Sequence, residues 1–137
     1  MKIRTLKNED EAQLLTLLTE LTTNPIKLQI HEVVGDSNCH AIVLDDGNGN
    51  IIGFAALVIH LVPTKGRVAR IEDVVITKSF RGQGLGERII DELIEIARNQ
   101  GIKHISLTSN PKREAARKLY QKKGFILLET GVFRLNL

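Results

Sequence analysis

One stretch, residues 71–101, limits what this chain can fold into more than any other part of it. It starts with a strand-like run, Ile71–Thr77, and continues after a short polar turn into R-G-Q-G-L-G at residues 81–86. An amphipathic pattern follows and stops at Gly101. Glycine lets a ligand approach the backbone, and a helix start leaves about four N–H groups unpaired with a partial positive charge. The stretch therefore predicts a strand, an anion-binding turn and a helix, suited to a diphosphate.

Two familiar nucleotide-binding motifs do not fit these glycines. The phosphate loop of nucleotide triphosphatases needs Lys and then Ser or Thr after its last glycine, whereas Gly86 is followed by Glu87 and Arg88. The dinucleotide fingerprint G-x-G-x-x-G has a wider last spacing than Gly82, Gly84 and Gly86 provide. The turn therefore belongs to neither class of nucleotide-binding protein.

Composition indicates an ordinary globular protein. The length of 137 residues favours one domain, residues 1–137, with 42% hydrophobic and 26% charged residues. The net charge of +3 is too small to indicate a nucleic-acid partner. Residues 98–123 hold eight Lys or Arg and one acidic residue, Glu114, without the interleaved aromatic residues that stack on bases. We interpret this run as a solvated helix face and expect no nucleic-acid partner.

Cysteine and histidine usage argues against disulfides and metal sites. Cys39 is the only cysteine, so no internal disulfide can form and a reducing compartment is favoured. The histidines, at positions 31, 40, 60 and 104, have no metal-ligand spacing, so no metal is expected. No apolar run approaches the roughly 18 residues of a membrane span, and the N-terminus lacks a signal-peptide core. We therefore expect a cytoplasmic protein with no membrane partner.

Antiparallel strands are expected before the glycine turn. The sequence predicts an edge strand over residues 1–6, helices over residues 8–23 and 25–34, a hairpin of residues 40–44 with 51–61, and a strand over residues 67–77. Asn8, with Glu11 three residues later, is expected to cap the first helix. This order argues against a doubly wound nucleotide fold, in which strands and helices alternate from the start.

After the turn, the sequence predicts a helix, a strand, a second helix and two short strands. A helix runs from the glycines to Gly101, and a strand is expected over residues 103–109. Asn110 and Pro111 are expected to start a second helix that ends at Gly124. Two last strands are predicted over residues 125–129 and 132–135. The fold class is therefore α/β (α+β), with antiparallel strands followed by β-α-β-like units.

This element order and two segments resemble the GNAT N-acetyltransferase family. R-G-Q-G-L-G behind a strand is similar to the family's acetyl-CoA signature, and residues 110–125 resemble its segment of Asn, helix, Tyr and Gly-Phe. The resemblance covers essentially the whole chain. It implies a central mixed, mostly antiparallel sheet that is splayed between the fourth and fifth strands and has helices on both faces. It also implies acetyl-CoA as cosubstrate and a homodimer. Residues 71–86 are similar to the small bacterial glucosamine-6-phosphate N-acetyltransferase-like members, from which residues 107–111 depart.

The resemblance also implies which residues hold acetyl-CoA. The pantetheine arm would enter the splayed gap and bond to the backbone of the fourth strand, as an added strand does. The glycine turn would hold the diphosphate through its N–H groups. The complete set implied for the cofactor is Val74, Val75, Ile76, Arg81, Gly82, Gln83, Gly84, Leu85, Gly86, Asn110, Arg113 and Arg117.

Three residues are candidates for the chemistry. Tyr120, the only tyrosine, matches the family position that protonates the departing CoA thiolate, although a buried core aromatic is the alternative. The acceptor ammonium must lose a proton before attack, and Glu72 is preferred over Asp73 as its base. These two are neighbours in a strand, so only one faces a given cleft unless a bulge intervenes. An ion pair with a nearby Arg, or deprotonation through water, remains open.

We therefore predict an enzyme that transfers an acetyl group from acetyl-CoA to a primary amine by direct attack. The resemblance implies a small-molecule amine acceptor, and the sequence does not identify it. Lys65, Arg67 and Arg70 could hold an anionic acceptor or could be surface charge. Two other functions stay open: a non-catalytic acyl-CoA-binding regulatory module of the same fold, and an acetyltransferase acting on a protein lysine or N-terminus.

Overall fold

The computed structural model describes residues 1–137, which form two compact units, Met1–Leu107 and Thr108–Leu137. Each unit is described by itself below. The first contains the whole sheet and three of the four α-helices, and the second contains the last helix and the C-terminal segment.

The first unit is built on a five-stranded open sheet in the order β1-β2-β3-β4-β5. Its strands are β1 (Lys2–Thr5), β2 (Cys39–Asp45), β3 (Ile51–Val62), β4 (Gly66–Ile76) and β5 (Ile105–Ser106). Neighbouring strands from β1 to β4 pair antiparallel, and only β4 and β5 run parallel. The predicted edge strand, the hairpin and the mixed, mostly antiparallel sheet are therefore confirmed.

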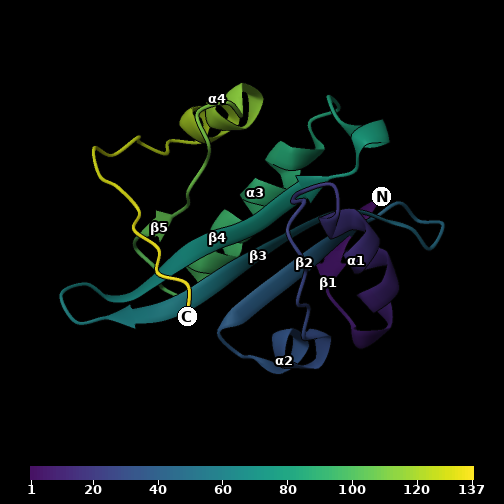
Figure 1. Ribbon diagram of the computed structural model, residues 1–137, viewed down its shortest axis with the longest axis horizontal. Coiled ribbons are helices and arrows are strands. Elements are labelled where there is room, and N and C mark those ends of the chain that lie inside the picture. The colour runs from purple at the N-terminus through teal and green to yellow at the C-terminus, as the bar shows by residue number, and fades with distance from the viewer. The chain divides into compact units, whose positions relative to one another are not determined.

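Helices cover both faces of this sheet. The first unit contains the 3-10 helices η1 (Asn8–Asp10) and η2 (Lys78–Phe80), and the α-helices α1 (Glu11–Leu18), α2 (Ile30–Gly35) and α3 (Leu85–Asn99). In Figure 1, α1 and α2 lie on the near side of the strands, and α3 lies behind β3 and β4. Side chains that alternate along each strand therefore enter two different apolar layers.

The core follows this alternation along β2. Ala41 and Val43 pack in one buried cluster with Leu14 and Leu17 of α1. Leu44, one residue further, points to the other face, toward the α3 side chains. One apolar layer thus holds α1 and α2 against the sheet and the other holds α3, and burial of these side chains is the main stabilising contribution.

The N-terminal region differs from expectation in two places. Asn8 does not cap α1, because it lies inside η1, and the carboxylate of Asp10 accepts the backbone N–H of Lys7 at 2.8 Å. The predicted helix over residues 25–34 is wrong in its first half, since α2 begins at Ile30. Ile26 and Leu28 pack against the core as partly buried side chains, which an extended segment with period two allows.

The fourth and fifth strands diverge, as the resemblance implied. β5 pairs with β4 only at Ala69↔Ile105 and Arg70↔Ser106. β4 continues to Ile76 on its other edge, where it stays paired with β3. The strand predicted over residues 103–109 is therefore far shorter than expected, and the β5-facing edge of residues 71–76 is left open.

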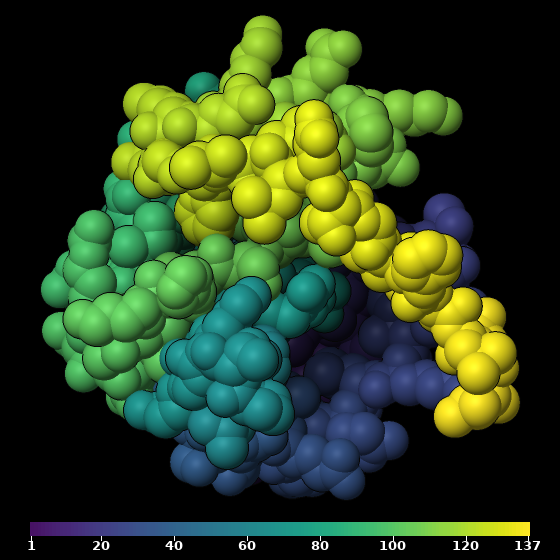
Figure 2. Space-filling model, turned by 90° about the vertical axis from the view of Figure 1, so that its left-hand side faces the viewer, coloured from purple at the N-terminus to yellow at the C-terminus, as the bar shows by residue number.

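The second unit contains α4 (Glu114–Lys122), which starts later than predicted. Asn110 is not its N-cap, because its Oδ1 atom accepts the backbone N–H of Lys112 at 2.9 Å in a tight turn. Residues 125–137 form neither strand nor helix, so the two strands predicted there are wrong. Their last residues run as an extended yellow chain in Figure 2. A strand needs a partner as well as β-prone residues, and these residues join no sheet.

Candidate functional site

The glycine turn leads directly into α3, as predicted. Gly82 and Gly84 have φ angles of 79° and 77°, which side-chain-bearing residues rarely adopt, and Gly84 is the N-cap of α3. The first backbone hydrogen bond of the helix runs from the N–H of Arg88 to the carbonyl oxygen of Gly84, at 3.2 Å. The N–H groups before Arg88 thus lie at the positive end of the helix, where an anion is stabilised. The turn fits the diphosphate of acetyl-CoA.

Arg81 is less free than its sequence position suggested. Its Nε atom donates to the carbonyl oxygen of Ile76 at 2.8 Å, and its Nη2 atom lies 3.7 Å from Oε1 of Glu20. The guanidinium still has solvent-facing N–H groups, since about half of its side chain is exposed. Arg81 therefore places positive charge at the turn while its own position is held by two protein acceptors.

The open edge of β4 fits an amide-rich arm. Val75 and Ile76 keep their pairing with β3, opposite Phe54 and Gly53, and no β5 residue pairs with them on the other side. An unpaired strand edge can accept a further extended chain through backbone hydrogen bonds. Successive residues of a strand turn their backbone groups to alternate edges, so the three residues implied for the pantetheine arm do not all face this one. Ile76 does, although Arg81 already occupies its carbonyl oxygen, whereas the pairing of Thr77 with Ile52 indicates that the groups of Val75 face β3.

A β-bulge interrupts β4 at Asp73. Phe54 pairs with Val75 and Ala56 pairs with Glu72, so the single residue between them on β3 faces two residues on β4. Asp73 has a φ angle of 56°, the only positive value at a residue other than glycine. Because of this bulge, the strict alternation expected for Glu72 and Asp73 does not hold.

The two carboxylates have different surroundings. Glu72 accepts a hydrogen bond from Nε of Arg70 at 3.1 Å, so it forms the ion pair that was the alternative to a catalytic role. Asp73 makes no hydrogen bond or ion pair in the structure. It lines a pocket of about 460 Å³ in the first unit, between the sheet and the segment that joins α1 to β2. The remaining lining residues are Leu18, Ile26, Lys27, Leu28, Gln29, Glu32, Val33, Asp36, Cys39 and Val58.

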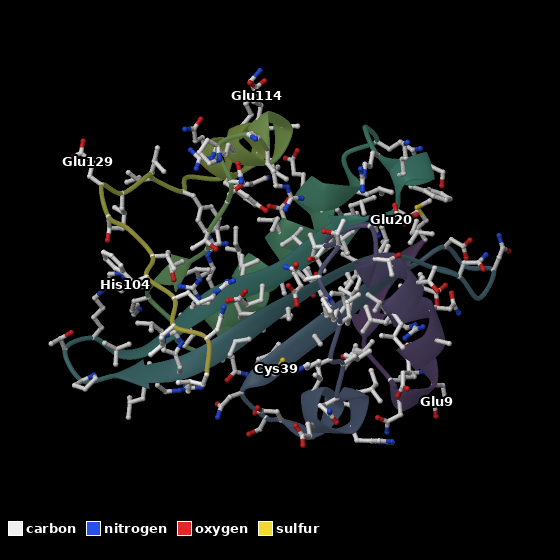
Figure 3. All side chains as sticks on the ribbon, viewed as in Figure 1. Glu9, Glu20, Cys39, His104, Glu114 and Glu129 are labelled. Atoms are coloured by element: carbon white, nitrogen blue, oxygen red, sulfur yellow. The ribbon has the colours of Figure 1, made fainter.

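The pocket wall changes the acidity of two groups in it. Although solvent reaches Asp73, loss of water around its carboxylate raises its pKa, and the neighbouring charge of Glu72 raises it further. Burial raises the pKa of the Cys39 thiol, and Asp36 adds to this effect. Cys39 is labelled in Figure 3, where it lies beside α2. A carboxylate with a raised pKa is a better proton acceptor, so Asp73 fits a general base more closely than Glu72.

Tyr120 belongs to the second unit and is the buried residue of α4, with 8% of its surface exposed. Its ring packs edge-on against Phe125, with centroids 5.9 Å apart. Burial raises the pKa of its phenol, while the positive charge of Arg113 acts in the opposite direction. The hydroxyl is thus kept protonated, as a general acid requires.

Three other residues of the second unit are candidates for cofactor binding, and the side chains of two of them already bond to protein groups. Asn110 and Arg113 have exposed side chains. Arg117 donates from Nη2 to the carbonyl oxygen of Ser109 at 2.6 Å, but its Nε atom is buried without a partner, and so is the Oγ atom of Ser109. Buried donors without partners are rare and favour a missing polar ligand. Arg117 therefore fits a role at a bound phosphate or amide.

The sequence did not indicate two sets of residues: those from positions 26–29 that line the pocket beside Asp73, and Glu20, which contacts Arg81. Residues 26–29 line the pocket, although the sequence predicts a helix there. Apolar and polar side chains alternate over Ile26, Lys27, Leu28 and Gln29, and this alternation indicates an extended segment. The sequence predicts Glu20 only as part of the helix over residues 8–23, and no local pattern indicates its contact with Arg81.

No group of three or more His, Cys, Asp or Glu side chains is arranged to hold a metal ion. None of the helices combines the length and the apolar character needed to cross a membrane.

Comparison with known proteins gives relatives over nearly the whole chain. The family model described as "Acetyltransferase (GNAT) family" matches residues 6–125. A glucosamine 6-phosphate N-acetyltransferase of Trypanosoma brucei brucei is 33% identical, with 91% of this chain and 88% of that protein covered. A glucosamine 6-phosphate N-acetyltransferase of Oryza sativa subsp. japonica is 28% identical, covering 91% and 81%.

The fold agrees with these sequence matches. The crystal structure of a Trypanosoma brucei acetyltransferase superposes with a TM-score of 0.84 and 33% identity, covering 99% of each chain. The family and these relatives support acetyl transfer to an amine, with acetyl-CoA as the donor that the family uses. The chain belongs to the GNAT acetyltransferase family.

Proposed function

We propose that this protein is an acetyl-CoA-dependent N-acetyltransferase whose acceptor amine binds in the pocket that Asp73 lines. One observation carries the proposal: the bulge at Asp73 turns an unpaired carboxylate with a raised pKa into this pocket, on the strand whose open edge leads to the glycine turn. Donor and acceptor would then approach the same strand. A family match that runs through both compact units supports a single domain over residues 1–137.

The reaction would proceed by direct attack. The acceptor ammonium gives a proton to the Asp73 carboxylate, directly or through water, and the free amine attacks the acetyl carbonyl carbon. The new C–N bond forms, the C–S bond breaks, and Tyr120 donates its phenolic proton to the thiolate of CoA. The nitrogen is positively charged after the attack, and it loses its second proton to the Tyr120 phenolate, directly or through water, which restores the phenol and leaves a neutral amide. The backbone N–H groups of the glycine turn and of β4 would position the donor, which lowers the entropic part of the barrier.

The first acceptor to test is glucosamine 6-phosphate. The names of the Trypanosoma and Oryza relatives support it. Within the pocket, Lys27 is the one cationic side chain that could meet a phosphate. Arg70, a candidate for this task in the sequence, is held by Glu72 instead.

The charges of the pocket favour a second candidate. Its lining has three carboxylates, Glu32, Asp36 and Asp73, against the single ammonium of Lys27. Acidic groups attract a protonated amine and repel a phosphate dianion. An amino sugar without phosphate, or a small polyamine, would suit this lining better than glucosamine 6-phosphate.

A thiol-release assay would separate the candidates. Acetyl-CoA is supplied with glucosamine 6-phosphate, glucosamine, spermidine or a lysine peptide, and released CoA thiol is measured. Selective turnover of glucosamine 6-phosphate supports the first acceptor, and selective turnover of glucosamine or spermidine supports the second. Turnover of the peptide alone would favour a protein acetyltransferase. Binding of acetyl-CoA in a thermal-shift titration without turnover of any amine would indicate a non-catalytic module.

Cys39 provides an independent test of the acceptor pocket. It is the only cysteine and lines the pocket, so an alkylating agent reports on that site alone. The acceptor should slow alkylation at a pH high enough to ionise a thiol with a raised pKa. An acceptor that is turned over but leaves the alkylation rate unchanged would place its binding elsewhere.

We also propose a cytoplasmic location and a homodimer. A single free cysteine suits a reducing compartment. The homodimer rests on the family resemblance, and light scattering at micromolar concentration would measure the mass against the 15.3 kDa of one chain.

A further inference from the structure

Glu20 connects two segments that lie far apart in the sequence. It follows α1 directly, in a turn where its N–H bonds to the carbonyl oxygen of Leu17 at 3.0 Å. Its side chain reaches the segment before the glycine turn. Glu20 is labelled in Figure 3, near α1. Oε2 accepts the hydroxyl of Thr77 at 2.7 Å, and Oε1 accepts the backbone N–H of Lys78 at 2.8 Å.

Through these contacts Glu20 caps the start of η2, although it is 58 residues away in the sequence. Lys78 is the first residue of η2, and its N-cap residue, Thr77, makes no side-chain bond to the helix it precedes. A hydroxyl at this position usually accepts one of the first N–H groups of the helix. Here the hydroxyl of Thr77 is a donor, and the carboxylate of Glu20 takes the capping role. Bonds to an ionised acceptor are stronger than neutral ones.

The same carboxylate reaches Arg81. The distance from its Oε1 atom to Nη2 of Arg81 is 3.7 Å, and Arg81 is also bonded to the carbonyl oxygen of Ile76. Glu20 therefore contacts both ends of the short segment from Thr77 to Arg81, which immediately precedes Gly82. The three contacts lower the pKa of Glu20, chiefly through the hydroxyl of Thr77 and the N–H of Lys78, so it stays charged near neutral pH.

We propose that Glu20 is a positioning residue for acetyl-CoA: it holds residues 77–81 so that the glycine turn presents its N–H groups to the diphosphate before the ligand arrives. The inference rests on the proposed function. Pre-ordering of a loop reduces the entropy lost on binding, which raises affinity without any direct contact to the ligand.

Two physical effects of Glu20 oppose each other, and this makes the idea testable. As a negative charge near a bound diphosphate, Glu20 would weaken binding, and its neutralisation would tighten it. As a positioning residue, it strengthens binding, and its removal weakens it. The sign of the change in affinity for acetyl-CoA therefore separates a positioning role from mere proximity.

The experiment compares Glu20→Gln, Glu20→Ala and Thr77→Val with the control Glu9→Gln. Glu9 is an exposed acid of η1, so its neutralisation removes one charge without touching the turn. Titration calorimetry gives the Kd of acetyl-CoA, and circular dichroism checks that each variant is folded. We expect Glu20→Ala to raise the Kd about tenfold, Glu20→Gln and Thr77→Val to raise it less, and Glu9→Gln to leave it unchanged. In steady state, the KM for acetyl-CoA should rise more than kcat falls.

Hydrogen exchange tests the positioning itself without any ligand. The Lys78 amide should exchange at least about tenfold faster in Glu20→Ala than in the wild type, with α3 amides unaffected. A wild type that binds acetyl-CoA and folded Glu20 variants that bind it equally well or more tightly would overturn the inference alone. A wild type that binds no acetyl-CoA would overturn the proposed function, and this inference with it.

Discussion

Glu72 and Asp73 are neighbours in β4, yet Glu72 is bonded to Arg70 while Asp73, at a φ angle of 56°, lines the pocket without a partner. The bulge that separates their surroundings costs backbone strain, on the order of 1–3 kcal/mol for such a conformation. Strain of this kind is kept where the rest of the fold enforces it. The sequence favours Glu72 as the base, but the unpaired carboxylate in the pocket makes Asp73 the first residue to test.

Asp73→Asn should lower kcat/KM by a factor of about 10² or more, because Asn keeps the shape but cannot accept the amine proton. Asn also tolerates a positive φ, so the fold is retained. Since burial raises the pKa of Asp73, the wild-type rate should fall as pH drops through a value above that of an ordinary Asp, and the variant should lack this acid limb. pH–rate profiles of both proteins measure this. A larger loss in Glu72→Gln than in Asp73→Asn would return the role to Glu72.

Tyr120→Phe should reduce kcat about tenfold to a hundredfold while the Kd of acetyl-CoA stays unchanged, since only the proton donor is lost. Burial raises the pKa of Tyr120, so the phenol stays protonated beyond the ordinary value of about 10, and the alkaline loss of rate should begin only above it. Stopped assays from pH 7 to 11 test this. The matched variant Phe125→Leu keeps the hydroxyl and removes the ring contact, so an equal loss there would indicate a packing role for Tyr120.

Gly84→Ala should weaken acetyl-CoA binding at least about tenfold and destabilise the fold by about 1–2 kcal/mol, because Gly84 has a φ angle of 77° at the start of α3. Gly35→Ala is the control, since Gly35 lies in α2 without a positive φ and with open space around its Cα. Calorimetric titration and urea unfolding measure the two effects. Equal affinities for the two variants would argue against the turn as the diphosphate site.

Asp10→Asn should lower the free energy of unfolding by about 2–4 kcal/mol at pH 7, because Asp10 is 6% exposed and forms a two-pronged pair with Arg4, at 2.8 and 3.0 Å. The hydrogen bonds from Arg4 lower the pKa of Asp10. Its stabilisation is thus complete above the pKa of an unfolded Asp and is lost as pH falls through the lowered folded pKa.

Urea unfolding at pH 7 and pH 2.5 tests this pH dependence. The difference between Asp10→Asn and wild type should shrink at the lower pH, because Asp10 of the unfolded chain is protonated there and part of the stabilisation by the folded carboxylate is lost. Glu9→Gln, one residue away and exposed, serves as the control and should change stability little at either pH. If the difference in the free energy of unfolding is the same at pH 7 and pH 2.5, Asp10 acts through packing and not through its charge.

The sequence alone predicted the parts of this protein that depend on local signals. The turn at Asp45–Asn50 and the alternation of apolar residues on either side were sufficient for the β2–β3 hairpin. The spacing of glycines before an amphipathic run was sufficient for the turn and α3, since positive φ angles and a helix start are properties of a few consecutive residues. The family resemblance needed this stretch together with residues 110–125.

Only the tertiary structure decided the features that depend on partners distant in sequence. A strand exists only where another strand pairs with it, so the length of β5 and the missing strands after Phe125 could not be read from β-prone residues. The bulge at Asp73 arises from its register against β3. Glu20 acts on Thr77 and Lys78 from 57 and 58 residues away, and no local pattern carries that information. Local chemistry thus determined the glycine turn and α3, and long-range packing decided which of the two carboxylates lines the pocket and which side chain contacts residues 77 and 78.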